Sequence, residues 1–181
     1  MSPQSGEAHA SCKKFPTGSY NQPMTKQPIE LDPVIEKALA IALYNQTKEL
    51  LRNPSRTNAQ DLEMIHMAHS SGHHWSRVGT TQNFAIGEWL CSRVYSVVNQ
   101  RRAALFHAQA GRKLCDTGLV EDWVVGFAEE SLVRAFIANG DLDSAKSHFD
   151  KAKSIAKTLD PKSREMLLAD LKDLNFEYRF Q

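Results

Sequence analysis

The sequence contains little cysteine and no long hydrophobic run. Only three of its 181 residues are cysteine. A set this sparse and odd in number argues against a disulfide scaffold and favours a reducing compartment, so we expect a cytoplasmic protein. The longest unbroken apolar run, Ala38 to Leu43, is far shorter than the ~20 residues that span a bilayer. The N-terminus also lacks the apolar core of a secretory signal, and we expect no membrane partner.

An excess of charge of either sign is also missing. The chain has 22 Lys and Arg against 21 Asp and Glu, a formal net charge of +1. No bulk field therefore favours a polyanion, and we expect no nucleic-acid partner, although a local basic patch stays open as a third alternative. The hydrophobic content of 41% is typical of a globular domain.

Motifs of several common enzyme classes are absent. We find no glycine-rich phosphate loop after a strand, no GxSxG elbow and no CxxC pair, which excludes the usual signatures of nucleotide binding, serine hydrolysis and dithiol exchange. Cys91 and Cys115 lie on apolar helix faces, and we interpret both as small hydrophobic residues.

The chain divides into a polar N-terminal segment and a longer apolar part. Residues 1–28 contain four prolines among Ser, Gly, Gln, Asn and Lys, a mixture that buries too little apolar surface to fold, so we predict a flexible tail. Residues 29–181 are predicted to form a single domain.

Helical start and stop signals recur throughout residues 29–181. Examples are Asp32 before Pro33, the capping-box spacing from Thr57 to Gln60, and Gly140 after an apolar stretch. No segment alternates as a strand does. We therefore predict an all-α fold of about seven helices, near residues 33–51, 57–76, 80–99, 101–116, 121–139, 141–159 and 161–177, the first with Ile35, Leu39, Ala42, Leu43 and Leu50 along one side.

The middle of the chain repeats with a period of 41 residues. Shifting the sequence by this amount superposes the third and fourth predicted helices on the fifth and sixth. The shift places Glu88 on Glu129, Arg93 on Arg134, Tyr95 on Phe136 and His107 on His148.

The second copy has the motif spacing Phe136, Gly140, Ala145, Phe149, Ala152. In this respect residues 80–160 resemble the tetratricopeptide-repeat family, which implies a right-handed stack of antiparallel helical hairpins with the last helix as a C-terminal cap. The chain departs from the family in its period, which is about 34 residues there, and in carrying glutamates where the motif has an early tryptophan. The strings from His69 to Trp75 and Glu88-Trp89 are also similar to those of uncharacterised bacterial proteins of this kind, which implies no activity.

Polar residues on apolar helix faces are the main functional signal. Projection at 100° per residue places Glu129 in an apolar stripe and His107 on a face of small residues. Counted from the turns, Glu88 and His107 reach the same end of their hairpin, as do Glu129 and His148, while His69 falls near the level of Glu88. We predict a layer of His69, Glu88, His107 and Glu129 across adjacent helices.

Imidazoles combined with carboxylates form the ligand set of a Zn²⁺ or non-haem Fe²⁺ site. The predicted metal ligands are His69, His73, Glu88 and His107, because His69 and His73 stack one turn apart. Glu129 would be a fourth ligand or the general base of a metal-dependent enzyme of unknown substrate.

Other interpretations stay open. His74 would replace His73 if the second helix is rotated. A Glu–His pair duplicated with the repeat can simply satisfy two buried polar groups, or the pairs can be exposed to solvent. The layer could bind a small molecule instead of a metal. The alternative function is a non-catalytic interaction module, whose helical groove binds a protein or peptide and whose histidines matter only for stability.

Overall fold

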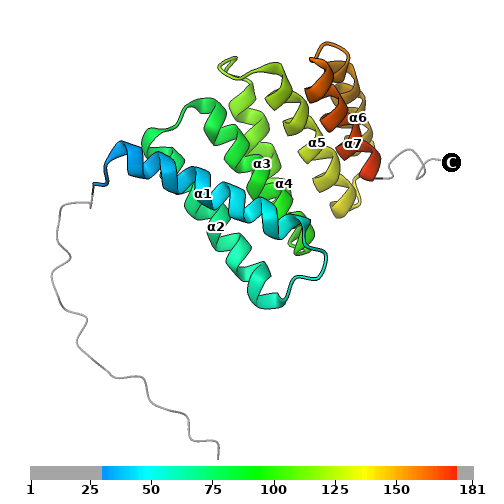
Figure 1. The fold of residues 1–181 in the computed structure, drawn as a ribbon. Coiled ribbons are helices and arrows are strands. Elements are labelled where there is room, and N and C mark those ends of the chain that lie inside the picture. The colour runs from blue at the N-terminus through cyan, green and yellow to red at the C-terminus, as the bar shows by residue number, and fades with distance from the viewer. Residues whose placement is uncertain (1–29, 175–181) are drawn as a thin grey trace, which may run out of the picture. The chain divides into compact units, whose positions relative to one another are not determined.

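The structure, a computed structural model, describes residues 30–174. Over this range the chain forms seven α-helices and no strand, which confirms the all-α prediction (Figure 1). The predicted N-terminal tail, residues 1–28, and the predicted end of the last helix beyond residue 174 lie outside the described residues. The helices are α1 (Pro33–Arg52), α2 (Asn58–Val78), α3 (Thr81–Val97), α4 (Arg101–Cys115), α5 (Asp122–Asn139), α6 (Leu142–Ala156) and α7 (Pro161–Asp173).

Local capping determines where most helices begin and end. α2 begins with a capping box, in which the Gln60 N–H donates to Thr57 Oγ1 and the Thr57 N–H donates to Gln60 Oε1. Thr80 caps α3 in the same way. Gly140 ends α5 with a φ of 82°, a left-handed conformation that glycine adopts without strain. α3 stops at Val97, two residues before the prediction, because Asn99 also takes a positive φ of 59°.

Consecutive helices pack against each other along the chain. The most extensive contacts join α1 to α2, α3 to α4 and α5 to α6, and weaker contacts join α2 to α3 and α4 to α5. In Figure 1 the elements succeed one another in sequence order, with α7 lying against α5 and α6. None of the described helices has the combination of length and apolar character that a membrane span requires.

Small residues bring the paired helices close together. The Ser71 hydroxyl of α2 donates to the Ala40 carbonyl of α1 at 2.8 Å, and the Ser92 hydroxyl of α3 donates to the Ala104 carbonyl of α4 at 2.9 Å. All four residues are at most 1% exposed. A side chain that reaches a neighbouring backbone carbonyl leaves no room for a larger residue, so these contacts set the spacing within both pairs.

The packing face of α1 differs from the predicted apolar side. Ile35 and Leu39 are 51% and 37% exposed, whereas Glu36, Ala40 and Thr47 are buried. The reason is that α2 supplies hydrogen-bonding partners for this more polar face, including a histidine for Glu36. The helix therefore buries polar groups that have hydrogen-bonding partners and leaves Ile35 and Leu39 of the predicted apolar side exposed.

The last helix packs into the largest apolar cluster. Leu167 and Leu171 of α7 are 0% and 3% exposed and contact residues of α5 and α6, with the partly buried Leu174 beside them. A Cβ added at Gly126 of α5 would lie 2.7 Å from Leu167 Cδ2. The absence of a side chain at this glycine therefore makes the space that the leucine fills.

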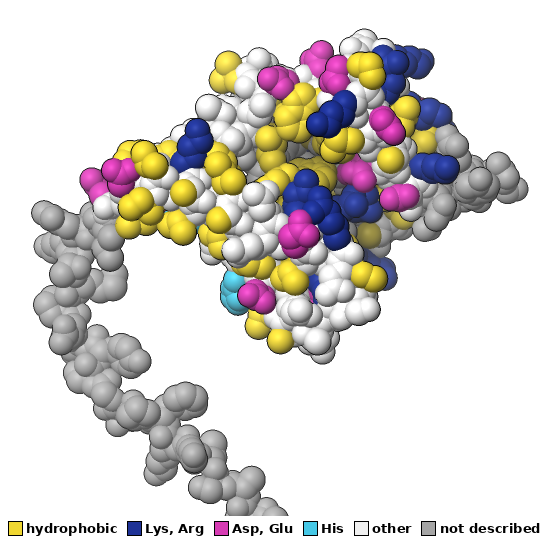
Figure 2. All heavy atoms as spheres, viewed as in Figure 1, with side chains coloured by type: hydrophobic (Ala, Val, Ile, Leu, Met, Phe, Trp, Pro, Cys, Tyr) yellow, Lys and Arg dark blue, Asp and Glu magenta, His cyan; other side chains and the backbone are white. Residues whose placement is uncertain are grey.

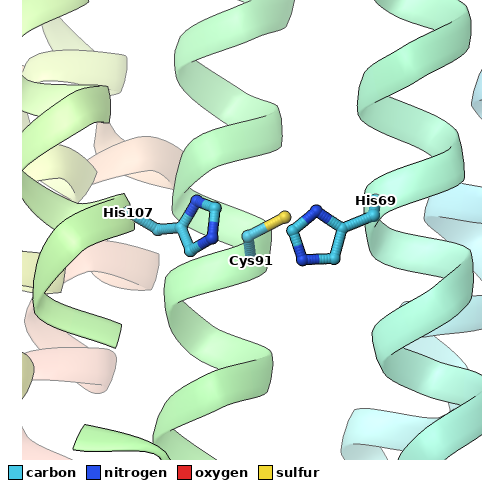
Figure 3. Close-up of side chains that lie close together, drawn as sticks. All are labelled: His69, Cys91 and His107. Carbon is cyan, nitrogen blue, oxygen red and sulfur yellow. The ribbon is translucent and has the colours of Figure 1, made fainter. Parts of the chain in front are cut away.

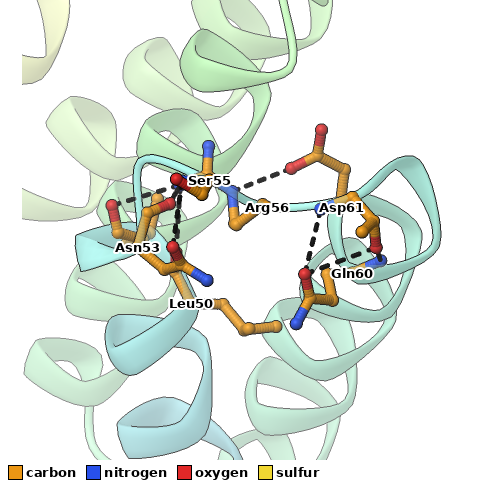
Figure 4. A network of polar contacts seen from close by, with 8 residues as sticks. Leu50, Asn53, Ser55, Arg56, Gln60 and Asp61 are labelled. Carbon is orange, nitrogen blue, oxygen red and sulfur yellow. Dashed lines mark hydrogen bonds and ion pairs between the residues drawn. The ribbon is translucent and has the colours of Figure 1, made fainter.

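One arginine joins the end of α1 to the start of α2. Arg56 Nη1 donates to the carbonyls of Leu50 at 3.0 Å and Asn53 at 2.6 Å, and Arg56 Nε donates to Asp61 Oδ1 at 2.8 Å (Figure 4). Its side chain is only 13% exposed. The guanidinium thus satisfies carbonyls at the C-terminus of α1, where the helix dipole favours a cation.

We expect Arg56→Ala to lower the free energy of unfolding by about 2 kcal/mol, because hydrogen bonds to a charged group contribute ~1.5–3 kcal/mol. Arg52→Ala is the matched control. Its side chain is 63% exposed and pairs only with the exposed Glu49, so the expected loss is below about 0.5 kcal/mol. Urea denaturation followed by circular dichroism measures both, and equal losses in the two variants would show that Arg56 has no capping role.

Candidate functional site

The two predicted glutamate–histidine pairs meet in the structure. His107 Nδ1 of α4 lies 2.7 Å from Glu88 Oε2 of α3, and His148 Nδ1 of α6 lies 2.5 Å from Glu129 Oε2 of α5. Both use the same histidine nitrogen and the same sequence separation. The repeat therefore places one hydrogen-bonded pair in each of these two helix pairs.

A third pair, which the sequence analysis did not predict, joins α2 to α1. His74 Nδ1 lies 2.6 Å from Glu36 Oε2. This contact turns His74 toward α1 and leaves the neighbouring His73 exposed, with its ring centroid 5.8 Å from that of His74. His73 is thus not brought to the other predicted metal ligands.

Glu129 is a buried ion with its own partners. It is 1% exposed and accepts hydrogen bonds from Arg112 Nε at 2.6 Å and from His148. Burial by itself raises its pKa, but the hydrogen bonds from His148 and Arg112 outweigh burial and hold the pKa below its usual value. These contacts satisfy the carboxylate and give no support to a role as metal ligand or general base.

A tighter group of side chains surrounds His107. Its ring stacks on Tyr95, with centroids 5.3 Å apart and planes 9° apart, and the Tyr95 hydroxyl hydrogen-bonds His69 Nε2 at 2.8 Å. The sulfur of Cys91 lies between the two imidazole rings (Figure 3). Within this group, one nitrogen from each histidine and the Cys91 Sγ all lie within 4.8 Å of one another.

Burial and nearby charges shift the pKa values of His69 and Cys91 in this cluster. Burial lowers the pKa of His69, and the proximity of His107 lowers it further. Burial raises the pKa of the Cys91 thiol to about 12, with a contribution from the Glu88 carboxylate. Cys91 was not predicted from the sequence as a possible ligand. The signal that could have identified it is its position three residues after Glu88, on the same helix face.

A cavity of about 340 Å³ lies on another part of the molecule. In the face drawn in Figure 2, hydrophobic side chains line a central hollow and Lys and Arg side chains stand around it. Its walls come entirely from the odd-numbered helices: Tyr44, Lys48, Leu51 and Arg52 of α1; Ile86, Trp89, Arg93 and Val97 of α3; Trp123, Val124, Phe127 and Arg134 of α5; Met166 and Asp170 of α7.

Two arginines of this wall surround one fully buried carboxylate. Glu130 of α5 is 0% exposed and pairs with Arg134, one helical turn along. Arg93 Nη1 of α3 lies 3.5 Å from Glu130 and 3.6 Å from Asp170 of α7, and the Trp89 indole N–H donates to Glu130 Oε2 at 3.4 Å. Burial raises the pKa of Asp170, and the charge of Glu130 raises it further, against the effect of the two arginines. The network links three helices beneath the cavity.

Two nitrogen atoms of this network are buried without a hydrogen bond to any residue of 30–174. They are Arg134 Nε and Arg93 Nη1, although the latter still forms ion pairs with Glu130 and Asp170. The two arginine side chains are 23% and 18% exposed and line the cavity, so their exposed parts offer positive charge to a ligand with acceptor oxygens.

The sequence analysis did not identify this cavity. Trp123 and Glu130 were not among the site residues predicted from the sequence. The signal was present in the repeat, because the shift of 41 residues superposes Arg93 on Arg134 and Trp89 on Glu130. The chain matches no protein-family model, and comparisons with curated proteins and with solved structures give no match either.

Proposed function

We propose that the chain is a tetratricopeptide-like stack of three helical hairpins, capped by α7, which binds an acidic peptide segment of a partner protein in the cavity. The pairing of α1 with α2, α3 with α4 and α5 with α6 supports the stack, as does the packing of α7 on the last pair. A Glu–His hydrogen bond in every pair supports it further, with the same separation of 19 residues in the second and third pairs and a separation of 38 residues in the first.

The observation that carries the binding proposal is the set of four cationic side chains that line the cavity, Lys48, Arg52, Arg93 and Arg134. A carboxylate accepts hydrogen bonds from arginine at two oxygens, so an acidic side chain would pair with the exposed parts of the Arg93 and Arg134 side chains. A neutral apolar ligand would make no such hydrogen bond.

The charge and the size of the cavity indicate the kind of ligand that it would bind. Four cationic side chains line the cavity against a single acidic one, Asp170. The tryptophans and Phe127 offer an apolar wall, and a volume of about 340 Å³ is near the lower end of the ~300–1,000 Å³ of ligand sites. The cavity therefore fits a few side chains of an extended peptide segment in which an acidic residue stands next to an apolar one.

A fluorescence-polarisation assay with two labelled peptide pools tests this function. The acidic pool contains eight-residue peptides with Asp or Glu beside Leu or Phe, and the matched pool has Asn or Gln at the acidic position. We expect saturable binding of the acidic pool alone. Equal binding of both pools would contradict the proposed recognition of a carboxylate.

Charge-removing variants then locate the binding surface. Lys48→Met/Arg52→Met removes two cavity charges from α1 and should weaken binding of the acidic pool about tenfold, more at low salt than at high salt. Arg101→Met/Arg102→Met removes the same charge from exposed positions of α4 outside the cavity and should leave binding unchanged. An equal effect of the two double variants would mean that only net charge matters.

A further inference from the structure

We propose that His69, Cys91 and His107 form a Zn²⁺ site with three protein ligands and one open coordination position. The ligands come from three successive helices, α2, α3 and α4, and their ligand atoms lie within 4.8 Å of one another. None of the three residues lines the cavity, so this site is independent of the peptide-binding function.

The side chains already face a common point. Figure 3 shows the Cys91 sulfur between the His69 and His107 rings. In a tetrahedral shell with Zn–S near ~2.3 Å and Zn–N near ~2.0 Å, ligand atoms are roughly 3.5 Å apart. Closing the cluster on an ion therefore requires a movement of about 1 Å by side chains that already converge.

Both imidazoles are oriented by a second hydrogen bond. Glu88 Oε2 holds His107 Nδ1 at 2.7 Å, which leaves Nε2 of that ring available to an ion. The Tyr95 hydroxyl holds the His69 ring at 2.8 Å. A carboxylate behind a histidine ligand is the usual outer-shell arrangement of zinc sites. Glu88 would therefore be a positioning residue and not a ligand.

Comparison among the repeats of this chain separates the site from the common Glu–His contact. The residue three positions after the glutamate is Leu39 in α1 and Leu132 in α5, but Cys91 in α3. The position of Tyr95 is occupied in the next repeat by Phe136, which stacks on its histidine in the same way but has no hydroxyl. The thiol and the hydroxyl thus occur together in the α3–α4 pair and in neither of the other two pairs, and His69 of α2 lies beside them.

The donor set indicates the metal. A thiolate with two imidazoles is too soft for Mg²⁺ or Ca²⁺, which prefer oxygen ligands, and is typical of Zn²⁺. The open fourth position would be filled by water or by a ligand from outside the chain.

The test is titration of the untagged, reduced protein with Zn²⁺ in competition with a chromophoric chelator, supported by Co²⁺ absorption spectra. We expect one tightly bound ion and a thiolate-to-cobalt charge-transfer band. Cys91→Ala should lose that band and weaken Zn²⁺ binding by at least about 100-fold, while Glu88→Gln should weaken it about tenfold. Cys115→Ala, which removes the other buried thiol, should bind as the wild type does.

His148→Gln controls for the Glu–His contact itself, because it removes an equivalent histidine outside the cluster, and it should also retain full Zn²⁺ affinity. Circular dichroism confirms that each variant is folded. If Cys91→Ala is less stable, the His148→Gln variant still tests whether loss of a Glu–His contact outside the cluster affects Zn²⁺ binding. Zn²⁺ bound with equal affinity by the wild type and Cys91→Ala would overturn the proposal, since the exposed histidines of α2 would then be the ligands. Absence of stoichiometric binding would overturn it as well.

Discussion

Replacing Leu167 with alanine is expected to lower the free energy of unfolding by about 3 kcal/mol, because truncation of a fully buried leucine costs ~2–5 kcal/mol. Leu167 is 0% exposed and lies in the apolar cluster that joins α7 to α5 and α6. Its Cδ2 fills the space beside Gly126. Ile155 and Leu159 border the same space, with Ile155 Cγ2 3.4 Å and Leu159 Cδ1 3.8 Å from a Cβ added at Gly126.

Leu168→Ala provides the matched control, because it removes the same atoms from the adjacent position of α7. Leu168 is 41% exposed, and its truncation should cost less than about 1 kcal/mol. Urea denaturation of both variants measures the difference. Equal losses would contradict the assignment of Leu167 as the residue that attaches α7 to the rest of the domain.

Replacing Glu130 with alanine is expected to have a comparable or larger effect, about 3–5 kcal/mol, because it breaks a buried ion pair by removing one partner. Arg93 and Arg134, with side chains 23% and 18% exposed, would keep their charges without the carboxylate that offsets them. The Trp89 indole N–H would lose its acceptor as well. Glu165→Ala, at an exposed position of α7, should cost less than about 0.5 kcal/mol.

A triple variant separates stability from binding. Arg93→Met/Glu130→Met/Arg134→Met replaces Glu130 and both of its arginines with apolar side chains of similar length and leaves Asp170 at the cavity wall. Replacing a buried ion pair in this way is often neutral or stabilising by ~1–4 kcal/mol. We expect the triple variant to unfold at higher urea concentration than Glu130→Ala but to bind no acidic peptide. A triple variant as unstable as Glu130→Ala would show that the charges are retained for stability and not for recognition.

Local sequence rules were sufficient for the helices and for part of the candidate site. Capping depends on residues close in the chain, and Thr57 with Gln60 or Gly140 could therefore be assigned directly. The meeting of Glu88 with His107 was also accessible, because antiparallel helices joined by a short turn bring equidistant positions together. Both inferences need only the geometry of one hairpin.

The remaining features depend on how helices rotate against one another, which local rules do not determine. The apolar side of α1 pointed to Ile35 and Leu39, yet the helix packs through Glu36 because His74 lies opposite. Cys91 lies on an apolar helix face, so from the sequence it cannot be told from a core residue. It becomes part of a cluster because His69 of α2 lies close to it. Rotation between separate hairpins decides which of the predicted residues meet: the ring of His73 lies beside His74, and Glu129 pairs with Arg112 and His148.

The cavity was beyond sequence reasoning for a similar reason. Its wall combines α1, α3, α5 and α7, which are separated along the chain by the even-numbered helices. The superposition of Arg93 on Arg134 indicated a repeated cation, but not that both would surround the carboxylate of Glu130. Such a network becomes visible only when the order and spacing of the odd-numbered helices are known.

The most direct measurement of the central claim is nuclear magnetic resonance titration of the ¹⁵N-labelled protein with the acidic peptide pool. We expect saturable shifts of the arginine Nε–H signals of Arg93 and Arg134 and of the indole N–H signals of Trp89 and Trp123. The indole of Trp75, which does not line the cavity, should stay unchanged. Shifts confined to Trp75, or the same shifts with the amide pool, would contradict recognition of a carboxylate at the cavity.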